Sequence, residues 1–406
     1  MDNTKEIKQN PELGLVFLPG FADGERDKSV HRHIQEINAK ITGTTERFEV
    51  GIRDRRFGSS EGTVGLAPNE PTSRKKHLVF IQDVLNRSEE CGYKIGDHFN
   101  LRSANDHFAD LKSSINASAK KAKLGECTAV MPYLYACRQD KSGHREGLDM
   151  AVALNELVNI GIRNVIVVDA HNPTAAENAI YKNSFDNILP SYDLVTEVLK
   201  SELAAYMDGK IMTFSPDQGA SARTRSFASI LMTPKGSFEK ERNFTKFENG
   251  KHPIGDLTYV GDRGSVVGKT AFIFDDMLDS GGTILEVAKM LKELGAKSVS
   301  AVVTHGIFNK GLEPFDRAVE SKILKNVFTT NSVYLGKEAR GRDWLKIVDI
   351  TELIAHSINA LHRGESLTPH VRGSEKLQTL CQSLGLQQDR FASVRRLAAD
   401  ALGQTD

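Results

Sequence analysis

The chain has 406 residues, which is enough for two or three domains that each bury a core of their own. Lysine and arginine together number 53, as do aspartate and glutamate, so the charge balance predicts neither a nucleic-acid partner nor attachment to an anionic membrane. The longest apolar runs are far shorter than the roughly 20 residues of a membrane-spanning helix, and the polar start has no secretory pattern, so we expect a cytoplasmic protein.

Short apolar, β-branched runs recur along the chain between stretches of helical pattern. In chain order, the clearest predicted strands are residues 15–18, 78–81, 128–131, 165–168, 271–274 and 299–303. Parallel strands that helices cover on both faces look continuously apolar, so this alternation predicts α/β domains with mainly parallel sheets. Glycine, serine, asparagine, proline and charged residues gather in three segments that we expect to be loops or insertions, namely residues 58–72, 86–105 and 233–268.

Two segments of the chain repeat one pattern. In each, a helical stretch ends at a glycine, a strand follows, and a histidine stands at the carboxyl end of the strand; the pairs are Gly161 with His171 and Gly295 with His305. We expect both glycines to end helices. Two half-proteins of similar build explain the repetition, although any two helix–turn–strand units share part of it.

The strongest chemical signal is the sequence that follows the predicted strand 271–274. Asp275 and Asp276 come directly after the strand, at the edge where ligands of open α/β sheets bind, and can accept hydrogen bonds from two ribose hydroxyls. The turn 280–283, Ser-Gly-Gly-Thr, then opens a helical run over 284–294. Its backbone N–H groups, its hydroxyls and the helix dipole predict a phosphate-binding turn. Helix capping by Asp279 or Ser280 alone is the simpler reading, but it leaves the paired carboxylates unexplained.

This segment resembles the signature that binds phosphoribosyl pyrophosphate (PRPP) in type I phosphoribosyltransferases, in the form seen in ribose-phosphate pyrophosphokinases. A second segment, MPYLYACRQDK at 131–141 with Arg145-Glu146 after it, resembles landmarks of the pyrophosphokinases that simple phosphoribosyltransferases lack. The resemblance extends from about residue 13 to about residue 366, with an insertion around residues 86–102. It implies an enzyme that transfers the β,γ-pyrophosphoryl group of ATP to the C1 hydroxyl of ribose 5-phosphate, giving PRPP and AMP.

The resemblance also implies the architecture. We expect an α/β fold of two tandem type I phosphoribosyltransferase-like domains, each a mainly parallel sheet flanked by helices, with a C-terminal helical tail. The expected boundaries are an N-terminal tail at 1–12, an ATP-contacting domain at 13–188, a domain with the ribose 5-phosphate site at 189–348, a terminal strand or helix at 349–366 that can pack on the N-terminal domain, and a helical extension at 367–406.

Several site residues follow from the resemblance, with Mg²⁺ as the cofactor. Arg138 and Gln139 would contact ATP, the arginine by a forked contact to phosphate oxygens. His171, in a Val-Asp-Ala-His sequence, would contact ATP and hold its Mg²⁺ together with Asp217, which lies in the sequence Ser-Pro-Asp-Gln-Gly. The ribose 5-phosphate set comprises Asp275, Asp276, Asp279, Ser280, Gly281, Gly282 and Thr283.

The catalytic residues implied are Lys240 and Arg242, in a segment similar to the Lys-Arg-Arg of the family's flexible loop. Glu241 stands between them where the family has a basic residue, so the positive charge is weaker than the pattern expects. Their expected role is to stabilise negative charge on the migrating phosphoryl group.

The family contacts the adenine of a neighbouring subunit's ATP with a Phe-x-Asp-Gly-Glu motif, which implies a homo-oligomer. The motif occurs verbatim at 21–25, but there it directly follows the first predicted strand. The sequence around residues 49–51 and 78–82 instead aligns the motif with Phe57, Ser59 and Glu61, which we prefer. Serine in place of aspartate can alter the preference for the base.

Two other functions remain open at this point. A phosphoribosyltransferase that consumes PRPP would use the 275–283 motif, but it needs neither the ATP segment nor a second domain. A non-catalytic regulatory subunit of the same family would explain everything except the joint retention of Lys240, Arg242, His171 and Asp217.

Overall fold

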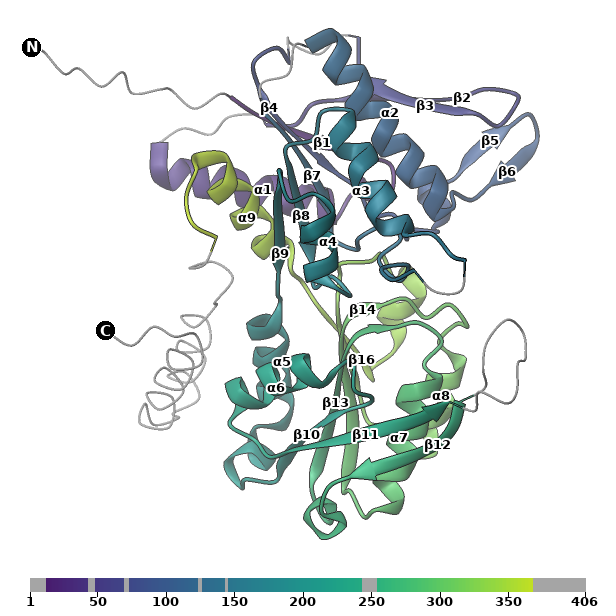
Figure 1. Ribbon diagram of the computed structural model, residues 1–406, viewed down its shortest axis with the longest axis vertical. Helices are drawn as coiled ribbons and strands as arrows, with labels where there is room; N and C mark the ends of the chain where they lie inside the picture. The colour runs from purple at the N-terminus through teal and green to yellow at the C-terminus, as the bar shows by residue number, and fades with distance from the viewer. Residues whose placement is uncertain are drawn as a thin grey trace, which may run out of the picture. The chain divides into compact units, whose positions relative to one another are not determined.

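The computed structural model describes residues 12–42, 48–68, 73–122, 126–142, 145–242 and 254–367. These residues divide into two compact units (Figure 1). The N-terminal unit runs to Leu189 and includes Ser332–Tyr334 and the chain from Ile350; the C-terminal unit comprises Pro190–Asn331 and Leu335–Asp349. The predicted tail 1–12 and helical extension 367–406 lie outside the described residues, apart from Glu12 and Leu367.

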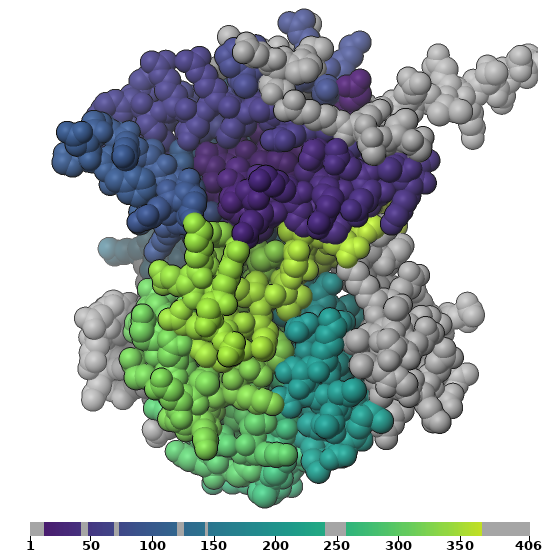
Figure 2. All heavy atoms as spheres, turned by 180° about the vertical axis from the view of Figure 1, so that it is seen from behind, coloured from purple at the N-terminus to yellow at the C-terminus, as the bar shows by residue number. Residues whose placement is uncertain are grey.

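The N-terminal unit contains a five-stranded parallel sheet in the order β1-β4-β7-β8-β9. Its strands are β1 (Leu13–Phe17), β4 (His77–Ile81), β7 (Cys127–Met131), β8 (Asn164–Val168) and β9 (Ser184–Ile188). Its helices are α1 (Arg26–Thr42), α2 (Ala104–Ala122), α3 (Asp149–Asn159), α4 (Pro173–Ala179) and α9 (Thr351–Arg363). Helices α1 and α9 share one hydrophobic core with the sheet and lie side by side, the purple and yellow segments of Figure 2.

The C-terminal unit contains a seven-stranded sheet in the order β12-β11-β10-β13-β14-β15-β16, parallel except for the β11–β12 pair. Its strands are β10 (Ile211–Ser215), β11 (Lys235–Arg242), β12 (Ile254–Val260), β13 (Thr270–Leu278), β14 (Ser298–Gly306), β15 (Val327–Thr330) and β16 (Leu345–Val348). Its helices are α5 (Ser191–Met207), α6 (Ser221–Leu231), α7 (Gly282–Glu293) and α8 (Glu313–Glu320).

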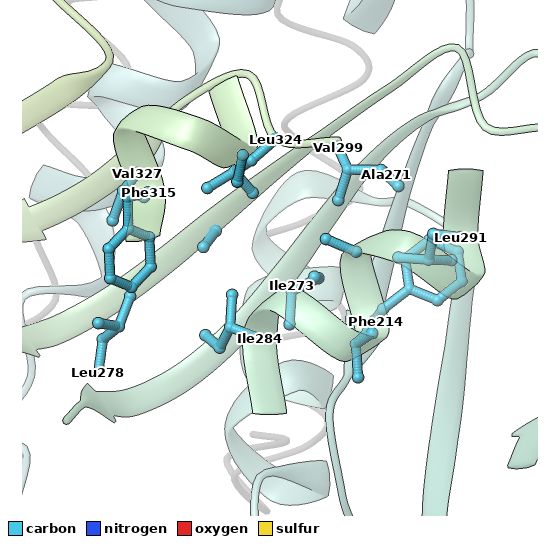
Figure 3. Close-up of a cluster of buried hydrophobic side chains, with 14 of the residues drawn as sticks. Phe214, Ala271, Ile273, Leu278, Ile284, Leu291, Val299, Phe315, Leu324 and Val327 are labelled. Carbon is cyan, nitrogen blue, oxygen red and sulfur yellow. The ribbon is translucent and has the colours of Figure 1, made fainter. Parts of the chain in front are cut away.

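Alternate residues of β13 enter two different cores, which explains the unbroken apolar run in the sequence. Ala271 and Ile273 pack with α7 and α8 on one face (Figure 3), whereas Phe272 and Phe274 pack with α5 and α6 on the other. The mainly parallel α/β architecture predicted from the sequence is therefore confirmed, as are the six predicted strands.

The three segments predicted as loops contain strands, and there the prediction was wrong in part. Residues 58–72 contain β3 (Gly62–Leu66), which pairs with β2 (Ile52–Arg56); residues 86–105 contain the hairpin of β5 (Tyr93–Ile95) and β6 (His98–Asn100); residues 233–268 contain β11 and β12. The two small hairpins are largely exposed, so their strands need no apolar alternation. Short 3-10 turns lie at Glu89–Cys91, Arg263–Val266 and Lys337–Gly341.

The two repeated glycines adopt the conformation that the sequence predicts for helix ends. Gly161 follows α3 with φ +121°, and Gly295 follows α7 with φ +90°, a region that other residues rarely enter. Each glycine then leads into a strand of its unit's sheet, β8 or β14. Among the described residues, no helix is long and apolar enough to cross a membrane.

Candidate active site

A turn at the carboxyl end of β13 carries the predicted phosphate-binding residues of the C-terminal unit. Gly281 has φ +78°, and a Cβ atom at this position would collide with the ring of Phe315. Helix α7 begins directly after Gly281 with no side-chain cap from that residue, so the positive end of its dipole lies at the turn. A hydrogen bond from the loop after β14 holds the turn, because the backbone N–H of Asn309 donates to the carbonyl of Asp279 at 3.1 Å.

The paired carboxylates lie inside β13 and not after it, since the strand continues to Leu278. Asp275 Oδ1 accepts from the backbone N–H of Asp276 at 2.9 Å, and Asp276 Oδ1 accepts from that of Met277 at 2.8 Å. Asp276 is only 3% exposed. Burial, followed by the charge of Asp276 and then that of Asp217, raises the pKa of Asp275 well above its ordinary range. Cations or hydroxyl donors of a ligand would offset the repulsion among the carboxylates of Asp275, Asp276 and Asp217.

Asp217 reaches the same edge from the neighbouring strand. It follows β10, which pairs in parallel with β13. Its Oδ1 accepts from the backbone N–H of Ala220 at 3.1 Å, and its carbonyl accepts from Ser215 Oγ. The sequence could not reveal that the charge of Asp217 acts on Asp275, because the two residues are brought together only by the pairing of β10 with β13.

The predicted catalytic pair lies on β11, the strand on the other side of β10. The last residue pair between β10 and β11 is Ser215 with Ser237, so β11 continues beyond the carboxyl end of β10. There the backbone of Lys240 pairs with Leu257 and that of Arg242 with Ile254, with a register shift between them. Gln218 Nε2 donates to Glu239 Oε1 at 3.3 Å, which joins the loop of Asp217 to β11. The side chains of Lys240 and Arg242 lie outside what the structure describes.

Neighbouring loops of the N-terminal unit carry Arg138, Gln139 and His171. The first two follow β7, His171 follows the adjacent strand β8, and the side chains of Arg138 and His171 are exposed. Asn172 Nδ2 donates to Asp140 Oδ2 at 2.6 Å and so ties the two loops together. Gln139 Nε2 is held by Glu146 Oε2 and the Gly147 carbonyl, both at 3.2 Å.

Phe57, Ser59 and Glu61 lie together at the exposed tip of the β2–β3 hairpin. Ser59 Oγ donates to Glu61 Oε2 at 2.7 Å, and the backbone N–H of Phe57 donates to the Glu61 carbonyl at 2.9 Å. The Arg55 guanidinium lies 4.7 Å from the centre of the Phe57 ring, which is 40% exposed. The sequence analysis missed Arg55, although in an extended segment an arginine two residues before an aromatic residue lies on the same face.

The verbatim copy of the motif at 21–25 has a structural role. Phe21 is fully buried, and Asp23 Oδ1 accepts from the backbone N–H groups of Glu25 and Arg26 at the start of α1. Asp23 also forms a buried ion pair with Arg26, at 2.5 Å. Phe21 and Asp23 are thus engaged within the fold, whereas Glu25 is exposed.

Magnesium chemistry fits the donors of the C-terminal unit. Within the described ranges, no three His, Cys, Asp or Glu side chains are grouped to hold a metal ion. Mg²⁺ requires fewer protein ligands, because it keeps several waters and takes one or two carboxylates together with substrate phosphates. Asp217 and Asp275 offer such oxygens at one sheet edge. His171 belongs to the other unit, so its pairing with Asp217 stays a prediction.

Comparisons with known proteins cover both units. The family model "N-terminal domain of ribose phosphate pyrophosphokinase" matches residues 21–161, and "Phosphoribosyl synthetase-associated domain" matches residues 162–372. A ribose-phosphate pyrophosphokinase of Prochlorococcus marinus (strain MIT 9313) is 31% identical over 271 residues, which is 66% of this chain and 76% of the relative. One from Ureaplasma parvum is 29% identical over 316 residues, or 77% and 84% of the two chains.

A solved structure gives an independent view of the fold. The phosphoribosylpyrophosphate synthetase of Mycobacterium smegmatis superimposes with a TM-score of 0.67 at 23% identity, covering 87% of this chain and 99% of that one. At this identity the likeness concerns the fold.

Proposed function

The chain belongs to the ribose-phosphate pyrophosphokinase family, and from this premise we propose that it converts ATP and ribose 5-phosphate into PRPP and AMP. Its two units have the type I phosphoribosyltransferase fold in tandem. The observation that carries the proposal is the turn 280–283 at the end of β13, with Asp275 and Asp276 beside it and the N-terminus of α7 directly after it.

We assign the sugar phosphate to this turn. The backbone N–H groups around Gly281 and Gly282, with the hydroxyls of Ser280 and Thr283, would bind the 5-phosphate, while Asp275 and Asp276 accept from ribose hydroxyls. Asp279 completes the set, as the resemblance implies. Two acceptors held by backbone N–H groups keep one orientation, which fixes the C1 hydroxyl for in-line attack.

The reaction forms a bond between the C1 oxygen and the β-phosphorus of ATP and breaks the bond from that phosphorus to the oxygen bridging to the α-phosphorus. AMP leaves with that oxygen. Lys240 and Arg242, on the strand that runs past Asp217, would stabilise the negative charge that develops on the transferred group. Mg²⁺ bound with ATP supplies further neutralisation of phosphate charge, and His171 and Asp217 would hold it.

ATP would be held by Arg138, Gln139 and His171 of the N-terminal unit. For the adenine we propose Phe57, Ser59 and Glu61 from a neighbouring copy of the chain, which fits their exposure at a hairpin tip. The active protein is then a homo-oligomer, and we expect it in the cytoplasm.

A mass measurement in solution at assay concentration is expected to give a multiple of the chain mass; a monomer that is fully active would contradict the shared adenine site.

Replacing Gly281 with alanine is expected to raise the KM for ribose 5-phosphate at least tenfold. The positive φ costs about 1 kcal/mol for an L-residue, and the added Cβ would push against Phe315 and displace the turn. Gly268→Ala is the matched control. Gly268 has a similar φ of +72°, but no atom lies within 4 Å of the position that a Cβ would take. It also lies just before the start of β13, away from the turn. The control is expected to lose stability and keep its KM; an equal rise in both variants would remove the turn from phosphate binding.

Isotopic labelling tests the reaction directly. With ATP labelled at the β-phosphorus, the label is expected in the sugar product and not in the released AMP. With a γ-label the sugar product is labelled as well. Transfer of the γ-label alone, with ADP as the second product, would contradict attack at the β-phosphorus.

A further inference from the structure

A cluster of four charged side chains, three of them buried, lies at the base of the β2–β3 hairpin in the N-terminal unit. Arg56 Nη2 donates to Asp110 Oδ2 of α2 at 2.5 Å, and Arg102 Nε donates to the same oxygen at 3.0 Å. Arg102 also donates through Nη2 to Asp54 of β2. Arg56, Arg102 and Asp110 are each at most 7% exposed. Two positive and two negative groups balance, yet burial raises the pKa of Asp110 to about 6 in spite of its two arginine partners.

The segment 86–102, which we interpret as an insertion, reaches this cluster through two residues. Arg102 Nη1 donates to the carbonyl of Cys91, so the guanidinium joins the insertion to both β2 and α2. Tyr93 of β5 packs against both arginines, with its ring centre 4.7 Å from Arg56 Cζ and 5.6 Å from Arg102 Cζ. The two hairpins accordingly lie side by side in Figure 1.

The glycines of the two hairpins are consistent with this packing. Gly62 pairs across the hairpin with Arg56, and a Cβ atom there would collide with the Arg56 guanidinium. Gly92 precedes Tyr93, and a Cβ atom there would collide with the ring of Phe99 on β6. Gly62 therefore leaves room for the Arg56 guanidinium, and Gly92 leaves room for the Phe99 ring within the β5–β6 hairpin.

Burying such charges gives little stability by itself, because the desolvation cost offsets most of the attraction. What the cluster can do is hold the β2–β3 hairpin in one orientation. Arg56 immediately precedes Phe57, so fixing the Arg56 side chain fixes the point from which the hairpin tip projects. The tip itself, residues 57–61, is exposed; its contacts are its own backbone hydrogen bonds, the bond between Ser59 and Glu61, and the Arg55 guanidinium against the Phe57 ring.

We propose that residues 86–102 form a clamp that positions the β2–β3 hairpin for recognition of the nucleotide base, with Arg102 and Tyr93 as positioning residues that contact no substrate. This inference rests on the proposed function, because it takes Phe57, Ser59 and Glu61 as the base-binding residues. It gives the insertion a role in the affinity for ATP and none in the chemical step or in binding ribose 5-phosphate.

The first test is the Tyr93→Ala variant, which removes the packing without leaving a buried charge unpaired. Its KM for ATP is expected to rise about tenfold, with kcat and the KM for ribose 5-phosphate within about twofold of wild type. Lys94→Ala is the matched control, because Lys94 is the next residue of the same strand and is exposed. Arg102→Lys, which keeps the charge but loses the forked contacts, is a second variant expected to show the same pattern.

Hydrogen exchange measures the clamp independently of catalysis. In Tyr93→Ala, the amides of residues 52–66 are expected to exchange about tenfold faster, while those of β7 and β8 keep their wild-type rates. Unchanged exchange in the hairpin would overturn the clamp. Faster exchange with an unchanged KM for ATP would overturn its role in base recognition. If the wild-type protein releases no AMP, the proposed function fails, and the exchange measurement still decides whether the clamp exists.

Discussion

Replacing Lys240 with alanine is expected to reduce kcat by about three orders of magnitude while ATP binding stays close to that of wild type. The reason is that a cation aimed at the transferred group acts on charge that develops only in the transition state, so its loss affects turnover far more than affinity. The backbone of Lys240 lies on the part of β11 that runs past the edge with Asp217, which suits this role. Steady-state AMP release and calorimetric ATP binding would measure the two quantities.

Lys235→Ala serves as the control for this variant. Lys235 begins the same strand, is exposed, and pairs with Thr213 before the sheet edge is reached. We expect it to keep the wild-type kcat. An unaffected rate in Lys240→Ala would remove Lys240 from the mechanism, and an equal loss in both variants would point to damage to the strand.

Replacing Asp275 with asparagine is expected to abolish binding of ribose 5-phosphate and yet stabilise the protein at pH 8. Burial and the charges of Asp276 and Asp217 raise the pKa of Asp275, so the folded state holds this proton more tightly than the unfolded state. As the pH rises above the ordinary range of aspartate, the unfolded chain releases its proton first, and stability falls until the folded carboxyl ionises too. Asparagine keeps an Oδ1 acceptor for the N–H of Asp276 and cannot ionise.

Thermal unfolding across pH tests this prediction with an internal control. The melting temperature of Asp275→Asn is expected to exceed that of wild type by a few degrees at pH 8. The difference is expected to shrink as the pH falls towards the ordinary pKa of aspartate, where Asp275 is neutral in both states. A variant that is less stable at pH 8, or that binds ribose 5-phosphate normally, would show that Asp275 is structural and not part of the sugar site.

The sequence predicted those parts of the site that are continuous in the chain. Residues 271–294 contain the strand, the two carboxylates, the glycine turn and the helix in one continuous segment. Local backbone conformation explains residue types such as Gly281, which adopts a positive φ. The same holds for Gly161 and Gly295 at their helix ends. Local chemistry of this kind needs no knowledge of the tertiary structure.

Features that depend on distant partners could not be predicted in this way. Asp217 influences Asp275 only because β10 lies beside β13. Arg102 reaches Asp54 only because the β2–β3 hairpin folds against α2. The small hairpins looked like loops because exposed antiparallel strands carry no apolar pattern. The range of β13 was also underestimated, since an apolar run ends at Phe274 although the pairing with β14 continues to Leu278.

The central claim is tested most directly by incubating the purified chain alone with Mg²⁺, ATP and ribose 5-phosphate and measuring AMP and PRPP together. We expect the two products in equal amounts, both dependent on ribose 5-phosphate and on the metal. No AMP under any phosphate or metal condition would contradict the account and favour a regulatory subunit, and consumption of PRPP with a free base would favour a phosphoribosyltransferase.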